Sequence, residues 1–156
     1  MYNKMLSNET LEQRIKILKS SGASIVFTNG CFDILHSGHV EYLEAAKQLG
    51  DILIVGINDD DSVRRLKGIN RPVNKLQDRL IIISALQSVD YVMSFSEDTP
   101  DNLIHKIVPD ILVKGGDYKK EHIIGAGYVE GYGGEVIILP FKAGYSSTEI
   151  IKRALE

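Results

Sequence analysis

Near its N-terminus the chain carries the run Ile25-Val26-Phe27-Thr28-Asn29-Gly30-Cys31-Phe32-Asp33-Ile34-Leu35-His36-Ser37-Gly38-His39, which predicts a strand, a turn and the start of a helix. The two histidines stand three residues apart, and residues with that spacing share one face of a helix. The free amide groups at a helix N-terminus favour an anion, and Gly38 lets a ligand approach the backbone closely. We therefore expect a phosphate site at this turn.

Apolar segments alternate with helical patterns along the rest of the chain. Segments 25–27, 52–57, 89–95, 111–113 and 136–139 are nearly continuous in apolar residues, as strands of a parallel sheet covered on both faces require. Apolar residues at helical spacing occur in 8–20 and 38–49. Three further helices are expected to begin after Asn74, which would form a capping box with Gln77, after Thr99-Pro100 and after Ser146. This alternation predicts a Rossmann-like α/β fold, a doubly wound five-stranded parallel sheet with helices on both faces.

In such sheets ligands bind beyond the C-terminal ends of the strands, where the strand order reverses. The turn that follows segment 25–27 lies at such an end. We expect Thr28, Asn29, Gly30, Cys31, Phe32, Asp33 and Gly38 to contact the bound phosphate ligand there, as part of the phosphate site of His36 and His39.

Bulk properties limit the remaining possibilities. The 156 residues, 44% hydrophobic and 25% charged, fit one domain over 1–156, with 1–23 as an N-terminal helical extension. The net charge of −3 gives no overall basic field for nucleic acid, and a single cysteine allows no internal disulfide. No apolar run approaches the roughly 20 residues that span a bilayer, and no secretion signal is present. We expect a cytoplasmic protein without nucleic-acid or membrane partners.

A zinc site is the alternative interpretation of His36 and His39, because a spacing of three also suits two ligands on one helix. A catalytic zinc ion needs a third protein ligand, and Asp33 is the only nearby candidate. We therefore expect no metal ion held by the protein. Cys31 is expected to pack at the tight turn, because no base in the pattern is dedicated to it.

The stretch from Gly30 to His39 resembles the nucleotidyltransferase superfamily with the HxGH signature, which includes cytidylyltransferases, pantetheine-phosphate adenylyltransferase and, more distantly, class I aminoacyl-tRNA synthetases. That superfamily carries a second signature at the start of a late helix, and Ser146, Ser147 and Thr148 match it. A capped helix start with spare hydroxyl and amide groups binds phosphate well. Ser146 as a plain helix cap is the simpler interpretation, and both can hold.

From about residue 25 to 151 the chain resembles the heptose-phosphate adenylyltransferase domain of lipopolysaccharide core synthesis. The stretches that carry this likeness are 27–33, 62–68, 71–74 with Asp78-Arg79, 97–100, 112–118 and 132–136. Glycerol-3-phosphate cytidylyltransferase is a weaker match, since it would have an arginine near Phe141. The common bifunctional form has a preceding sugar-kinase domain, for which the residues before Ile25 are too few, so we expect the single-function form with a separate heptose kinase upstream.

The resemblance implies roles for further polar residues. A basic residue on a loop after the second strand would reach the triphosphate, with Lys67 as our choice and Arg65 as the next candidate. Arg79 either contacts phosphate or pairs with Asp78 or another acid. After the fourth strand, Gly116 and Asp117 would meet the nucleotide and Lys114 the substrate. Asn58 and the three aspartates after it either cap the next helix or hold sugar hydroxyls or magnesium.

The implied reaction is adenylyl transfer, in which the phosphate of D-glycero-D-manno-heptose 1-phosphate attacks the α-phosphorus of ATP and pyrophosphate leaves. Mg²⁺ carried on ATP is the implied cofactor, and a homodimer or higher homo-oligomer the implied assembly. His36 and His39 would donate hydrogen bonds to phosphate oxygens, Lys67 would hold the outer phosphates, and Asp33 would orient the turn. A cytidylyltransferase acting on another phosphorylated alcohol, such as glycerol 3-phosphate, and a nucleotide-binding module without turnover remain as alternatives.

Overall fold

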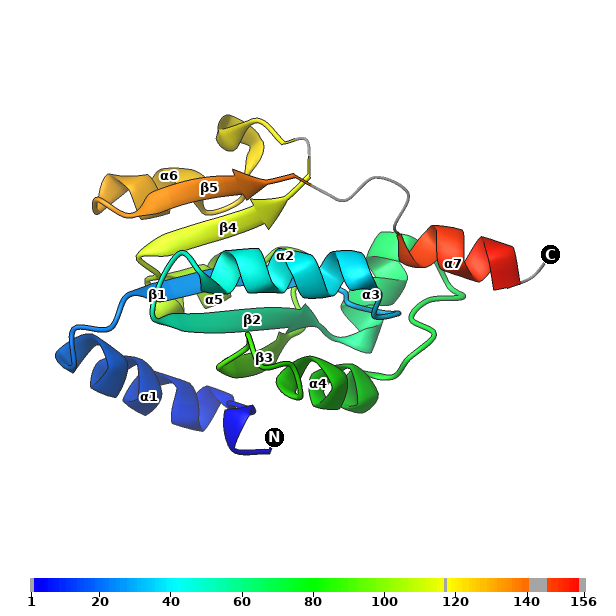
Figure 1. The fold of residues 1–156 in the computed structure, drawn as a ribbon, viewed down its shortest axis with the longest axis horizontal. Coiled ribbons are helices and arrows are strands. Elements are labelled where there is room, and N and C mark those ends of the chain that lie inside the picture. The colour runs from blue at the N-terminus through cyan, green and yellow to red at the C-terminus, as the bar shows by residue number, and fades with distance from the viewer. Residues whose placement is uncertain (1, 117, 141–145, 155–156) are drawn as a thin grey trace.

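One parallel sheet forms the centre of the molecule in the computed structural model, which describes residues 2–116, 118–140 and 146–154. Its strands stand in the order β3-β2-β1-β4-β5, and all four pairings are parallel (Figure 1). The strands are β1 (Ile25–Gly30), β2 (Ile52–Asn58), β3 (Tyr91–Phe95), β4 (Ile111–Gly115) and β5 (Glu135–Leu139). The predicted doubly wound sheet is confirmed, and its order reverses between β1 and β4.

Helices cover both faces of the sheet. On one face lie α1 (Asn8–Ser20), α5 (Asp101–Ile107) and α6 (Ala126–Gly131), and on the other α2 (Ser37–Lys47) and α4 (Leu76–Ser84). Helix α3 (Asp60–Lys67) follows β2, and α7 (Ser147–Ala154) ends the described chain. Two short 3₁₀ helices, η1 (Tyr2–Lys4) and η2 (Lys120–His122), complete the elements described.

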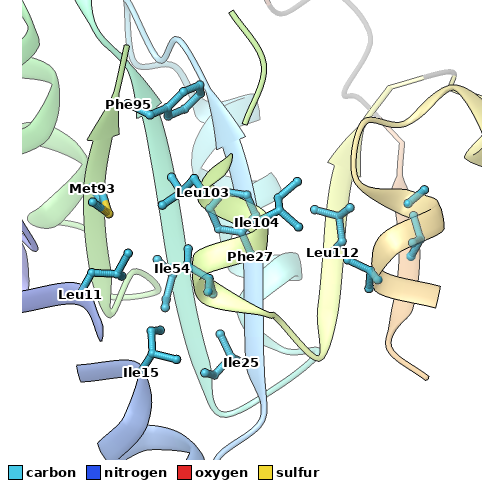
Figure 2. Close-up of a cluster of buried hydrophobic side chains, with 14 of the residues drawn as sticks. Leu11, Ile15, Ile25, Phe27, Ile54, Met93, Phe95, Leu103, Ile104 and Leu112 are labelled. Carbon is cyan, nitrogen blue, oxygen red and sulfur yellow. The ribbon is translucent and has the colours of Figure 1, made fainter. Parts of the chain in front are cut away.

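Each face of the sheet carries its own apolar cluster. Figure 2 shows Phe27 of β1 and Ile54 of β2 beneath Leu103 and Ile104 of α5. Val26, the neighbour of Phe27, belongs to the opposite cluster with residues of α2 and α4. Successive side chains of a strand point to opposite faces, so the continuous apolar runs of the sequence supply both clusters at once.

The N-terminal segment packs as part of the same core. Leu11 and Ile15 of α1 are buried in the first cluster, and the backbone of Met5 pairs with Val92 beside the edge strand β3. The Lys4 ammonium donates to the carbonyls of Leu86 and Val89. The described part of the expected helical extension 1–23, residues 2–23, therefore covers one sheet face and one sheet edge.

Two local expectations were wrong. Lys67, expected on a loop, is the last residue of α3, whose N-cap Asp59 accepts a hydrogen bond from the Ser62 amide at 2.8 Å. Asn74 does not cap a helix: α4 begins after Lys75, and the Asn74 amide group donates to the carbonyl of Asp33. The Asp59 cap starts the helix that includes Lys67, and the contact with Asp33 draws the Asn74 side chain away from α4. Among the helices of the described ranges, none is long and apolar enough to cross a membrane.

Candidate active site

A cavity of about 580 Å³ opens at the carboxyl ends of β1, β2 and β4, where the strand order reverses. The turn after β1 and the starts of α2 and α7 contribute to its lining, together with the end of α3 and the segment after β4. The sequence-predicted residues that line it are Asn29, Gly30, Cys31, Phe32, Asp33, His36, Gly38, His39, Asn58, Lys67, Lys114, Ser146, Ser147 and Thr148.

Four sequence-predicted residues lie elsewhere. Thr28 is fully buried and shares a hydrogen bond of 2.6 Å with the Tyr42 hydroxyl. Arg65 pairs at 2.7 Å with Asp98, a residue of the cavity wall, but does not line the cavity itself, and the Gly116 amide donates to the Leu139 carbonyl. Arg79, described below, is the fourth, and Asp117 lies outside the described residues. Because Thr28, Arg65 and Gly116 do not line the cavity, the expected direct contact of these residues with a ligand there is corrected.

The two histidines form a stacked pair at the start of α2. His36 occupies the N-cap position, and its ring centroid lies 3.7 Å from that of His39 at an interplanar angle of 21°. The Phe32 ring packs edge-on against His39, with centroids 5.2 Å apart. Gly38 between them leaves the backbone open toward the cavity. The sequence pattern thus places both rings together on one wall.

Burial changes the protonation of this pair. Desolvation, with a smaller contribution from the neighbouring His36, lowers the pKa of His39 to about 4, and desolvation also lowers the pKa of His36. A neutral imidazole carries one N–H donor and one acceptor. The Nδ1 atom of His39 is buried without a hydrogen-bond partner among the described residues, an arrangement that favours ligand binding over a packing role. At neutral pH the pair can therefore donate hydrogen bonds without acting as cations.

We expect a proton NMR titration to give His39 a midpoint near pH 4, well below the ordinary value of 6.5. The unfolded chain takes up this proton from about pH 6.5 downward, while the folded protein resists it. The contribution to the free energy of unfolding is thus complete above pH 6.5 and is lost as the pH falls toward 4. A His39 midpoint at or above 6.5 in the free protein would contradict the burial of this ring.

Asp33 fixes the turn to the loop before α4. Its side chain is fully buried, and one carboxylate oxygen accepts from the amides of Val73 at 2.7 Å and Asn74 at 2.9 Å. The other oxygen accepts from Nε of Arg71. These contacts connect the histidine turn with the loop before α4, as the expected orienting role of Asp33 requires.

Arg79 stands behind the cavity and pairs with an acid, one of the two alternatives left open by the sequence. It is fully buried, and its guanidinium donates to the carbonyls of Cys31, Asn58 and Asn74 and to the carboxylate of Asp60. It does not line the cavity. The expectation of substrate contact is therefore corrected, because all four interactions position other segments: the turn, the end of β2, the loop before α4 and the start of α3.

Cations outnumber anions in the cavity wall. Its charged residues, within the described ranges, are Lys67, Arg71 and Lys114 against Asp33 and Asp98. Lys114 at the end of β4 donates to the side chain of Asn29 at 3.2 Å, and burial lowers its pKa. The local charge is opposite to the net charge of −3 for the chain, so the cavity attracts an anion by its own arrangement.

Helix α7 brings the second set of hydroxyl groups to the same cavity. The Ser146 hydroxyl accepts a hydrogen bond from the Glu149 amide at 3.0 Å, which makes Ser146 the cap of this helix. Ser147 donates its hydroxyl proton to the carbonyl of Ile34 at 3.0 Å. This last contact ties the start of α7 directly to the histidine turn, so the two phosphate-type sites share one wall.

Sequence reasoning missed the part of the wall that follows β3, and at the end of β4 it found Lys114 but none of the lining residues from Tyr118 to Ile124. Loops at the carboxyl ends of these strands were a usable signal, since that edge of the sheet holds the ligand in this fold. Arg71 follows no strand, and although it belongs to the family-like stretch 71–74, the sequence assigned it no role. The lining residues without an expected role are Tyr42, Leu66, Arg71, Asp98, Thr99, Pro100, Leu112, Gly115, Tyr118, His122, Ile123 and Ile124.

The described residues contain no group of three or more histidine, cysteine or acidic side chains that could hold a metal ion. Both carboxylates of the cavity wall already pair with arginines, Asp33 with Arg71 and Asp98 with Arg65. The cationic and hydrogen-bond-donating side chains of the cavity wall suit an anion better than a metal ion.

Comparison with known proteins places this geometry in context. The profile of a family described as cytidylyltransferase-like matches residues 27–153. The bifunctional protein HldE of Nitrosococcus oceani is 57% identical over 145 residues, 93% of this chain, and that of Klebsiella pneumoniae subsp. pneumoniae is 54% identical over 149 residues, 96% of this chain. The chain spans only 31% of the length of either relative.

Two solved structures share the fold. The lipopolysaccharide core biosynthesis protein from Thermoplasma volcanium GSS1 has a TM-score of 0.65 at 30% identity, covering 78% of this chain and 98% of its own. Pantoate-beta-alanine ligase from Francisella tularensis has a TM-score of 0.61 at 20% identity, covering 94% of this chain and 75% of its own, a likeness of fold alone.

Proposed function

The chain belongs to the cytidylyltransferase-like family of nucleotidyltransferases, and on that premise we propose that it transfers AMP from ATP to a heptose 1-phosphate, giving ADP-heptose and pyrophosphate. An oxygen of the acceptor phosphate attacks the α-phosphorus of ATP in line with the leaving group. The bond from that phosphorus to the bridging oxygen of the β-phosphate breaks, and pyrophosphate departs. The acceptor phosphate is ionised at neutral pH, so the reaction needs no strong general base.

The observation that carries this proposal is the shared wall of the histidine pair and α7. His36 and His39 would donate hydrogen bonds to oxygens of the reacting phosphate, where charge builds up in the transition state. Ser146, Ser147 and Thr148 would anchor the pyrophosphate, because the hydroxyl of Ser147 already fixes α7 to the turn at Ile34. Catalysis in this arrangement is alignment and neutralisation of charge.

Mg²⁺ is proposed as the companion of ATP. The carboxylates of Asp33 and Asp98 are engaged by arginines, so the described residues suit an ion that arrives on the triphosphate better than one held by a protein cage. Bound there, the ion supplies neutralisation of phosphate charge. Asn58, at the end of β2, lines the cavity, and its side-chain amide donates to the Ser62 hydroxyl at 2.9 Å. We propose that Asn58 contacts the sugar.

The identity of the substrates is proposed from the relatives and is tested by a turnover panel. We expect pyrophosphate release with ATP and D-glycero-D-manno-heptose 1-phosphate in at least one anomer, and much slower release with CTP or with glycerol 3-phosphate. Preference for CTP and glycerol 3-phosphate would replace this function by cytidylyl transfer. Tight ATP binding with no pyrophosphate from any sugar phosphate would make the protein a nucleotide-binding module.

The proposal is completed by a homodimer or higher homo-oligomer in the cytoplasm and by a kinase that phosphorylates the sugar beforehand. The kinase step follows from chemistry, because the acceptor must already carry a phosphate at its anomeric carbon. Sedimentation of the purified protein measures the assembly directly.

Replacing Lys67 by alanine is expected to raise the KM for ATP on the order of tenfold or more, with a smaller change in kcat. Lys67 ends α3 at the cavity and would hold the outer phosphates, contacts that exist already in the ground state. Steady-state kinetics with ATP varied at saturating sugar phosphate measures this. Unchanged constants in this variant, together with a raised KM in Arg65→Ala, would transfer the role to Arg65.

A further inference from the structure

Arg71 is a cavity residue to which neither the sequence motifs nor the proposed reaction assigns a task. It lies in the connection between α3 and α4, and its side chain is only 14% exposed. Arg71 nevertheless lines the main cavity, in contact with Asp33 of the turn after β1. A largely buried guanidinium needs partners for its charge and for its N–H donors, and these come from the protein or from a ligand.

One edge of the Arg71 guanidinium is fixed by the protein. Nε donates to the carboxylate of Asp33, a side chain with no exposed surface. The second oxygen of that carboxylate is held by the amides of Val73 and Asn74. These contacts orient the plane of the guanidinium, so its direction is set before any ligand binds.

The other edge has no partner in the described part of the chain. Within residues 2–116, 118–140 and 146–154, the only hydrogen bond and ion pair of Arg71 side-chain atoms is the one from Nε to Asp33. Asp98, the second carboxylate of the wall, is taken by Arg65 through Nε at 2.7 Å. The two terminal amino groups of Arg71 therefore remain as donors for a ligand.

The geometry points to Arg71 as a substrate-binding residue, and we propose that its two terminal amino groups bind a phosphoryl group of a substrate as a fork. A planar guanidinium matches two phosphate oxygens, whereas a carbonyl or hydroxyl group offers one acceptor to the pair. Asp33 is the positioning residue of this fork. The proposal rests on the proposed function for the choice of ligands, ATP or the sugar 1-phosphate, which both carry such groups.

Calorimetric titration of Arg71→Gln tests the proposal. Glutamine can still donate to Asp33 but lacks the fork and the charge. We expect the Kd of one ligand, ATP with Mg²⁺ or heptose 1-phosphate, to rise on the order of 10- to 100-fold, as for the loss of charged hydrogen bonds. The ligand whose Kd rises identifies the phosphoryl group. In steady-state kinetics the KM for the same ligand rises more than kcat falls.

Matched variants separate the fork from simple charge. Arg64→Gln removes the same charge from an exposed residue that pairs with Asp61 outside the cavity, and its Kd values stay within about twofold of the parent. Arg71→Lys keeps the charge and loses the fork, and remains weaker than the parent. Parent-like Kd values for both ligands in Arg71→Gln, or full recovery in Arg71→Lys, would overturn the proposal.

A measurement on the unaltered protein guards against a variant that does not fold. Phenylglyoxal modification followed by mass spectrometry should show protection of Arg71 by the ligand identified above, but not of Arg64. Absence of protection at saturating concentrations of both ligands would overturn the fork. The proposed reaction can fail independently of the fork. If the parent releases no pyrophosphate, titration with inorganic pyrophosphate and phosphate still compares the parent with Arg71→Gln. Equal binding of these anions by both proteins rejects the fork.

Discussion

Replacing His39 by alanine is expected to reduce kcat for pyrophosphate release by about 10²- to 10³-fold, the usual cost of removing one donor to transition-state charge. The ring of His39 stacks on His36 and meets the edge of Phe32 in the cavity wall, so its orientation is held without a bound substrate. The lowered pKa of His39 keeps the imidazole neutral at neutral pH, so its N–H donor attracts the phosphates of bound ATP less strongly than a cation would. We expect the loss in kcat with little change in the KM for ATP.

The control for His39→Ala is His105→Ala. His105 stacks on Tyr128, with centroids 3.8 Å apart, away from the cavity, so the same substitution removes a stacked ring without touching the site. Steady-state rates of pyrophosphate release and circular dichroism of both variants measure activity and fold. A folded His39→Ala protein with near-parental kcat would reject the proposed role of this ring.

Replacing Arg79 by methionine is expected to lower the free energy of unfolding by about 3–5 kcal/mol, the cost of breaking a buried ion pair by removing one partner. Methionine retains much of the aliphatic length but none of the donors. The carbonyls of Cys31, Asn58 and Asn74 lose their shared partner, and Asp60 loses its cation. For a domain of this size the loss corresponds to roughly 6–20 °C in Tm.

Arg64→Met is the control for this experiment, since its pair with Asp61 lies on the surface of α3 and exposed pairs contribute about 0–1 kcal/mol. Chemical denaturation and thermal melting of the two variants give the comparison. Because Arg79 holds the turn after β1 against β2 and α3, we also expect Arg79→Met to lose activity at temperatures where it is folded. A Tm within a degree or two of the control would show that these carbonyls find other donors.

Local patterns were sufficient for the parts of this molecule that depend on near neighbours. Apolar runs along the chain predicted five buried strands, and the histidine spacing predicted two neighbouring rings. The rings do lie together, but His36 is the N-cap residue before α2 and so does not share a helix face with His39. The cap at Ser146 followed from its hydroxyl three residues before the Glu149 amide. Lys67 lines the cavity but ends helix α3, whereas the sequence interpretation put it on a loop, because the capping aspartate at 59 begins a helix that runs to Lys67.

The sequence by itself determined the parallel sheet, the edge of that sheet at which the cavity lies and the residue types of the histidine turn, because strand periodicity and helix-start chemistry act over a few residues. Only the tertiary structure decided which arginine serves which purpose. Arg65, Arg71 and Arg79 are alike in sequence, yet they pair with Asp98, Asp33 and Asp60 respectively. Those acids come from distant segments, so burial and unused donors could be assigned only after the chain had folded around them.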